Sequence, residues 1–140
     1  MINKLPTIKE SCGVKMIMLK KDKLPKFDGN IVLMFPKSVT GSQITNLLGK
    51  EVDIQVFDDM IEATYMEVKD FCCWEVDELL TKLFSLCDSE ILLLAESKYD
   101  AKVLVDIVFY HYEKFPALAF TGANMEYIHM IKAEISIDPY

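Results

Sequence analysis

Acidic side chains crowd one stretch of the sequence, and aromatic side chains lie among them. Residues 51–78 contain ten carboxylates and a single base, Lys69. The carboxylates are those of Glu51, Asp53, Asp58, Asp59, Glu62, Glu67, Asp70, Glu75, Asp77 and Glu78. Carboxylates speed the encounter with a basic partner, and apolar contacts then hold the complex. The stretch therefore predicts a binding surface for a basic protein.

Nine residues of this stretch are candidates for the contact. Aromatic side chains are typical anchors of a protein interface, provided that they are exposed, and acids suit its charged rim. The candidates are Asp53, Phe57, Asp58, Asp59, Glu62, Tyr65, Glu67, Asp70 and Trp74. A nuclease is such a partner, because its own site must be cationic to hold phosphates. The alternative is a solvated acidic face that only maintains solubility.

The histidines offer the main functional alternative, a small-molecule-binding protein or an enzyme of unknown substrate. His111 and His129 are the only histidines, and both lie among apolar neighbours. Such positions favour a structural role over a catalytic one. The chain contains no GxSxG, no Gly-rich phosphate loop and no HExxH, which are the common signatures of hydrolases and nucleotide-binding enzymes. We therefore expect a binding protein and not an enzyme, with no catalytic residue.

The four cysteines, Cys12, Cys72, Cys73 and Cys87, lack the CxxC spacing of a zinc site. Adjacent cysteines in an extended chain point to opposite sides, so Cys72 and Cys73 do not converge on one metal. We expect free and mostly buried thiols, because cysteine is among the residues most often buried. The sequence predicts no metal site and no cofactor.

The composition is that of one folded domain. The chain has 140 residues, of which 51% are hydrophobic and 26% charged, and such a chain can bury a sizeable core. We expect a single domain over residues 1–140, with residues 1–12 as a candidate N-terminal arm. No run of 18 apolar residues and no signal-peptide pattern occurs, which predicts a cytoplasmic protein without a membrane segment. The oligomeric state is left open.

The charge is unevenly distributed along the chain. Residues 1–50 hold nine lysines and three acids, whereas residues 51–140 hold six lysines and nineteen acids. The chain contains no arginine, the residue best suited to bidentate phosphate capture and base reading. We therefore expect no direct contact with nucleic acid, despite the lysines near the N-terminus.

The C-terminal forty residues show the clearest periodicity. From residue 102 to residue 112 every second side chain is apolar, which is typical of a strand with one buried face. Pro116 begins an apolar run that predicts a second strand over residues 117–120. Met125, Ile128 and Ile131 then recur at helical spacing, and alternation returns over residues 134–138. We expect strand, strand, helix and strand in this order.

The first half of the chain begins with a predicted loop that contains Pro25 and Gly29. Residues 31–35 are continuously apolar, as in a central strand. A helix follows, capped by Thr40 or Ser42 and ended by Gly49. Residues 51–57 and 61–68 form two further predicted strands around a turn at residues 58 and 59. In the second of them two alternating patterns compete, so its register stays undecided.

Apolar spacing from Val76 to Cys87 predicts an amphipathic helix, and acids in its first turn suit the helix dipole. Residues 90–98 fit a second helix or a strand, and their leucine, alanine and glutamate content favours the helix. The recurrence of strand, helix and strand predicts an α+β fold with ferredoxin-like layers, a mostly antiparallel sheet with helices packed on one face. The predicted core contains Leu33, Leu48, Leu80, Val105, Ile107, Phe109 and Ile137.

Two segments of the chain resemble a bacterial family known as a domain of unknown function. NIVLMFPKSVTGSQITNLLG resembles its opening strand, turn and helix, and the long apolar strand, FPALAF, helix and AEISIDPY resemble its C-terminal half. Together they cover most of residues 30–140. The family or its close relatives include immunity proteins of polymorphic toxin systems, among them contact-dependent growth inhibition. The resemblance implies an immunity protein that binds a cognate toxin domain and covers its active site.

Overall fold

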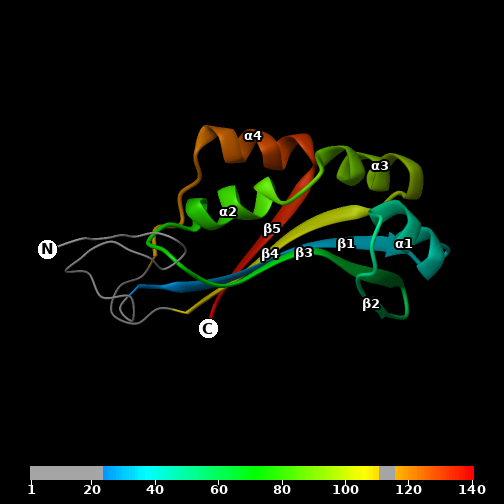
Figure 1. The fold of residues 1–140 in the computed structure, drawn as a ribbon, viewed down its shortest axis with the longest axis horizontal. Helices are drawn as coiled ribbons and strands as arrows, with labels where there is room; N and C mark the ends of the chain where they lie inside the picture. The colour runs from blue at the N-terminus through cyan, green and yellow to red at the C-terminus, as the bar shows by residue number, and fades with distance from the viewer. Residues whose placement is uncertain (1–23, 111–115) are drawn as a thin grey trace, which may run out of the picture.

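The computed structural model describes residues 24–110 and 116–140, which form five strands and four helices (Figure 1). In chain order these are β1 (Lys26–Pro36), α1 (Gly41–Leu48), β2 (Asp53–Val56), β3 (Met60–Cys72), α2 (Val76–Ser85), α3 (Ser89–Tyr99), β4 (Lys102–Tyr110), α4 (Gly122–Met130) and β5 (Ala133–Pro139). The predicted arm at residues 1–12 and His111 lie outside the described residues.

The strands form one sheet in the order β2-β3-β1-β4-β5. β1 runs antiparallel to β3 and to β4, and β2 runs antiparallel to β3, whereas β4 and β5 are parallel. β1 to β4 thus have the strand order and the βαββαβ connectivity of a ferredoxin-like layer. α4 and β5 extend this layer at the β4 edge. The predicted α+β class with a mostly antiparallel sheet is confirmed.

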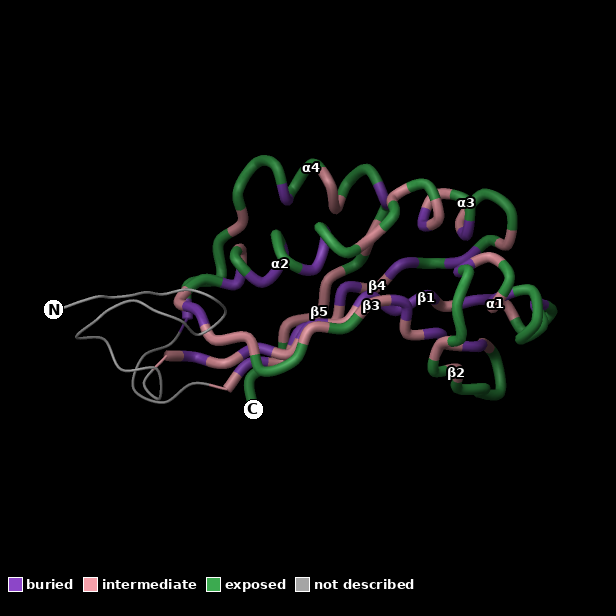
Figure 2. The backbone as a smooth tube through the Cα atoms, in the orientation of Figure 1, coloured by how far each residue is buried: buried purple, intermediate pink, exposed green. Residues whose placement is uncertain are grey.

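Helices cover one face of the sheet, and we call the opposite face the open face. In Figure 1 the helices α2, α3 and α4 lie on the same side of the strands. Along β4 the residues Val103, Val105, Ile107 and Phe109 are buried, and the residues between them are not, because successive strand side chains point to opposite faces. Figure 2 shows this alternation as purple and pink segments along the sheet. Side chains on the open face are mostly half-buried in the described part of the chain, and Val32 there is 8% exposed.

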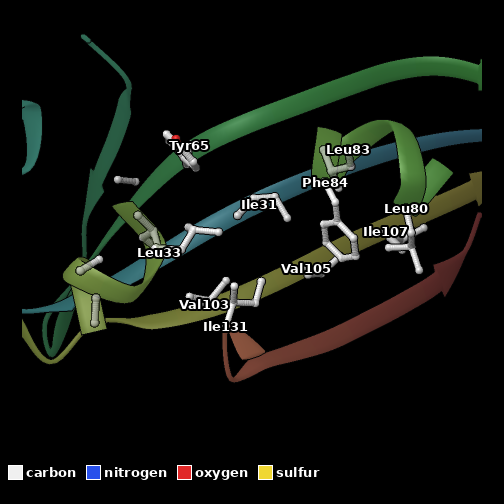
Figure 3. Close-up of a cluster of buried hydrophobic side chains, with 14 of the residues drawn as sticks. Ile31, Leu33, Tyr65, Leu80, Leu83, Phe84, Val103, Val105, Ile107 and Ile131 are labelled. Atoms are coloured by element: carbon white, nitrogen blue, oxygen red, sulfur yellow. The ribbon is translucent and has the colours of Figure 1, made fainter. Parts of the chain in front are cut away.

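The core lies between the sheet and the helices (Figure 3). Leu80 and Leu83 of α2 are fully buried, as are Ile31 and Ile107 of the strands below them. Gly29 allows α2 to pack closely against β1, since a Cβ atom at residue 29 would lie 3.1 Å from Cδ2 of Leu79. Of the seven predicted core residues, six are buried, and Ile137 on the edge strand is partly buried against them.

The helix ends follow their capping residues. The Thr40 hydroxyl accepts a hydrogen bond from the Gln43 amide at 3.1 Å, and the Gln43 side chain accepts one from the Thr40 amide at 2.9 Å. This reciprocal pair fixes the start of α1. Gly49 ends the helix with φ of 72°, a left-handed conformation that glycine adopts without strain. The predicted cap and stop of this helix are both confirmed.

Each of the two competing alternating patterns of β3 faces the helices in one part of the strand, which explains why the sequence left its register undecided. Ala63 and Tyr65 point to the helices in the first part of the strand. The pairing with β1 then shifts by one residue between Ile31 and Val32. Beyond that bulge Met66 and Val68 face the helices instead, since one extra residue reverses the facing of every later side chain.

Several element boundaries differ from the sequence-based expectation. β1 begins at Lys26, within the segment that was expected to be a loop. Residues 117–120 form no strand, and only Ala117 makes an isolated bridge, to Glu75, so the predicted second strand is wrong. Residues 90–98 belong to helix α3, which decides the choice between helix and strand.

A hydrogen-bonded latch joins α4 to α2. Asn124 is 7% exposed, and its amide Nδ2 donates to Oδ1 of Asp77 at 2.8 Å and to the Thr81 hydroxyl at 3.1 Å. The Thr121 amide also donates to Oδ1 of Asp77, at 2.9 Å. Burial acts to raise the pKa of Asp77, but the hydrogen bonds from Asn124 and Thr121 outweigh it, so the pKa lies below its ordinary value of 3.8. The ionised carboxylate thus stabilises the packing of the two helices.

Replacing Asp77 with Asn should give a pH-dependent loss of stability. A carboxyl with a lowered folded-state pKa stabilises above its unfolded pKa, and this contribution disappears as the pH falls through the folded value. The wild type should be the more stable protein at pH 6, and the difference should shrink below pH 3.8. Urea unfolding at several pH values measures it. Asp58→Asn, at an exposed turn, should show no such trend, and an equal difference at every pH would contradict the latch.

Candidate functional site

The β2–β3 hairpin is the part of the predicted surface that the structure brings together. We call residues 53–62 the acidic hairpin. Phe57 and Met60 flank a turn at residues 58 and 59, and the Phe57 amide donates to the Met60 carbonyl at 2.8 Å. Asp53, Asp58 and Asp59 are exposed, and Glu62 is half-buried on β3. Four of the candidate acids therefore lie within one short hairpin.

Apolar side chains lie in the middle of these carboxylates. Val56 is 65% exposed and Phe57 is 41% exposed. Val56 pairs with Ile61 and lies on the helix side of the sheet, but β2 is the edge strand, so in the part of the chain that the structure describes no strand packs beyond it. Exposed apolar groups within a polar rim are the arrangement expected of a protein-binding surface. The sequence analysis identified Phe57 as a candidate but did not include Val56.

The carboxylates of the acidic hairpin are not neutralised by neighbours. Asp53, Asp58, Asp59 and Glu62 form no ion pair in the described part of the chain. A lysine lies at the turn, since Nζ of Lys37 donates to the Phe57 carbonyl at 2.9 Å. This bond attaches the turn to the β1–α1 loop. The uncompensated carboxylates leave a negative local field that would attract a basic partner.

Tyr65 does not belong to the surface. It is 4% exposed and lies among the buried side chains of the core in Figure 3. Its hydroxyl accepts a hydrogen bond from the Asp88 amide at 3.3 Å, and burial raises its pKa. The expectation that Tyr65 anchors a partner is therefore wrong, because the β3 bulge turns it toward the helices.

The remaining candidates lie farther along β3. Ten residues separate Met60 from Asp70, about 33 Å at the usual rise of a strand. Glu67 is exposed and forms an ion pair with Lys69 at 3.6 Å. Asp70 forms one with Lys26 at 3.3 Å, and its φ of 57° marks a second bulge. Trp74 is half-buried beyond the end of the strand. Since a standard contact covers about 800 Å² per partner, one centred on the acidic hairpin does not reach Trp74.

The groups considered for catalysis are dispersed. His129 is exposed near the end of α4. Burial raises the pKa of Cys73 to about 12 and that of Cys87 to about 11, so at neutral pH both are thiols and weak nucleophiles. Both are free, as expected, whereas Cys72 is disulfide-bonded, so the expectation of a free thiol is wrong there. Residues 24–110 and 116–140 contain no group of three or more His, Cys, Asp or Glu side chains that could hold a metal.

Changing both histidines to Gln should leave the protein fully functional if neither is catalytic. His129 is exposed, and surface substitutions usually change stability by less than about 0.5 kcal/mol. The expected result for His111→Gln/His129→Gln is an unchanged melting temperature and unchanged protection of cells against the partner proposed below. Loss of that protection by a folded double variant would instead support the enzyme alternative.

Comparison of the chain with protein-family models, with curated proteins and with solved structures finds no significant match. Within the described residues, none of the helices combines the length and the apolar character needed to cross a bilayer.

Proposed function

We propose that this protein is an immunity protein, which binds a cognate toxin domain with a basic nuclease site and neutralises it by covering that site. The observation that carries the proposal is the acidic hairpin, where Val56 and Phe57 are exposed among four carboxylates that form no ion pair within the described residues. The resemblance of most of residues 30–140 to a family that includes immunity proteins, itself or among its close relatives, supports it. The action would take place in the cytoplasm, where nucleic acid is exposed to such a toxin.

The chemistry of the surface suits this partner. A nuclease holds its substrate by neutralising phosphates, so its site presents lysine and arginine side chains. The carboxylates of Asp53, Asp58 and Asp59 would pair with those cations, and the Phe57 ring would provide an anchor. The contact must extend beyond ten residues to reach a standard area of about 800 Å² per partner. The β1–α1 loop, attached through Lys37, lies beside the hairpin (Figure 1).

The experiment is an inhibition assay with the toxin domain encoded beside this gene. Increasing amounts of the purified protein should abolish its nuclease activity at a ratio of one to one, and co-expression should protect cells. A toxin complex that binds a nuclease substrate as tightly as the free toxin domain does would contradict active-site covering, because a covered site excludes the substrate. Full nuclease activity with an excess of this protein would overturn the proposal.

Replacing Phe57 with Ala should weaken the toxin complex by about tenfold or more, because truncating a central anchor costs about 1–2 kcal/mol or more. The dissociation constant, measured by calorimetry, checks this result. Leu118→Ala is a matched control, since Leu118 is 40% exposed and Phe57 is 41% exposed. Equal affinities for both variants would remove Phe57 from the contact.

A further inference from the structure

The sheet ends at β5, whose outer edge is unpaired in the described part of the chain. The Tyr140 amide donates to the Phe109 carbonyl at 2.9 Å, toward β4. Backbone groups alternate in direction along a strand, so the N–H and C=O groups of Ile135 and Ile137 point to the free side. The backbone of Pro139 also points to the free side. Proline has no N–H to donate, and it is tolerated there because the strand is at the edge of the sheet. Ala133–Ile137 is therefore a segment to which another strand can add.

The two faces of this edge differ in chemistry. Ala133, Ile135 and Ile137 lie on the helix side and are only partly buried. Glu134, Ser136 and Asp138 lie on the open face, opposite Leu104, Asp106 and Val108 of β4. An added strand would thus place one set of alternate side chains against apolar groups and the other set against carboxylates.

A row of hydrogen-bond acceptors continues from this edge across the open face. Asn30 of β1 pairs with Asp106 of β4, and Asp106 pairs with Ser136 of β5. Oδ1 of Asn30 is buried and has no hydrogen-bond partner. Burial and the neighbouring Asp138 raise the pKa of Asp106. Asp138 accepts a hydrogen bond from the Ser136 hydroxyl at 3.1 Å, and within residues 24–110 and 116–140 no cation pairs with the carboxylates of the row.

We propose that the free edge of β5 binds an extended segment of a second protein, in which basic side chains alternate with apolar ones. The backbone of that segment pairs with Ile135 and Ile137, as in other cases of strand addition. Its lysines or arginines extend over the open face to Asp138 and Asp106, the next strand being about 4.8 Å away. Its apolar side chains cover the exposed parts of Ile135 and Ile137.

The acids disfavour one pairing with a second copy of this chain, the antiparallel register centred on Ser136. In an antiparallel pair of β5 strands centred on Ser136, Glu134 of one copy would lie opposite Asp138 of the other. Like charges directly opposite each other destabilise a strand pair. The same carboxylates favour a basic strand, so charge provides specificity in both directions. This surface is at the opposite edge of the sheet from the acidic hairpin and does not depend on the proposed toxin contact.

The test uses the full-length protein and a capped heptapeptide in which lysine alternates with valine. Fluorescence anisotropy should show saturable binding, and the same residues in block order should bind at least about tenfold more weakly. Asp106→Asn/Asp138→Asn should reduce the affinity for the alternating peptide by about tenfold. Glu126 is an exposed acid on α4, and Glu126→Gln should leave this affinity unchanged. Reversing the charges of the acidic hairpin should leave the peptide affinity unchanged, which separates this proposal from the toxin contact.

Peptide N-methylation tests the strand pairing without changing the protein. Methylating all lysine amides or all valine amides blocks opposite edges of the peptide, so one modification should reduce affinity by about tenfold or more and the other should not. Valine sensitivity would indicate antiparallel pairing and lysine sensitivity parallel pairing. Equal effects of the two modifications, no binding to the wild type, or a dimer in sedimentation that the peptide does not dissociate would each overturn the proposal.

Discussion

Replacing Ile107 with Asp should unfold the protein at room temperature. Ile107 is fully buried in β4, where it pairs with Gly29 of β1 and with Ile137 of β5. An unpaired buried carboxylate costs several kcal/mol, and a small domain has a total stability of about 5–15 kcal/mol. Circular dichroism should show loss of the folded spectrum or a melting temperature reduced by at least about 15 °C.

Lys102→Asp is the control for this variant, because Lys102 is exposed in the same strand. It should change the stability by less than about 0.5 kcal/mol. The open face already tolerates a carboxylate in this strand at Asp106. If Ile107→Asp melted at the wild-type temperature, the assignment of the buried face of β4 would be wrong.

Reversing Asp58, Asp59 and Glu62 to Lys should strongly slow association with the toxin and weaken the protection of cells. Electrostatic steering mainly affects the association rate, which approaches about 10⁸ M⁻¹s⁻¹ at low salt for a complementary pair. With three charges reversed, we expect a rate lower by roughly ten- to a hundredfold. The fold should survive, because surface charges contribute little to stability.

The salt dependence provides the physical signature. The Debye length decreases from about 10 Å at 0.1 M to about 3 Å at 1 M salt, so the difference between wild type and variant should shrink as salt rises. A control with the same change in net charge reverses three exposed acids outside the hairpin, Glu90, Asp100 and Glu126. It should retain most of the association rate. Equal slowing by both variants would mean that total charge, and not this surface, controls the encounter.

Elements with one dominant period could be predicted from the sequence. β4 and α2 each show a single period, and their buried residues are those that the pattern indicates. β3 could not be assigned, because a bulge at Tyr65 joins two opposite alternations within one strand. A bulge depends on pairing with β1, which is 30 residues or more away, and no local pattern reports it.

The apolar run at residues 117–120 shows the opposite error. Its composition is typical of a strand, but strand formation requires a neighbour with free backbone groups. Ala117 forms only a short backbone pairing near Trp74, whose carbonyl accepts a hydrogen bond from the Ala117 amide at 2.9 Å. The sheet edge beside β4 is instead taken by β5, whose alternation was correctly identified.

The sequence indicated which residue types the candidate site contains, but not which of these residues lie together on one surface. Acidic side chains could be predicted to lie at the protein surface, because ionised side chains are rarely buried without a partner. Aromatic residues give no such guide: Phe57 is exposed in the turn, Tyr65 is buried by the bulge, and Trp74 lies at the far end of the strand. Only the three-dimensional arrangement reduces the nine candidates to the acidic hairpin.

Amide hydrogen exchange of this protein, alone and saturated with the toxin domain, tests the central claim most directly. The account predicts slower exchange in residues 53–62 and in the β1–α1 loop on complex formation, because a covered backbone exchanges less with solvent. The α4 and β5 segments should exchange as in the free protein. Protection confined to segments outside the acidic hairpin, in a complex of confirmed stoichiometry, would contradict the account.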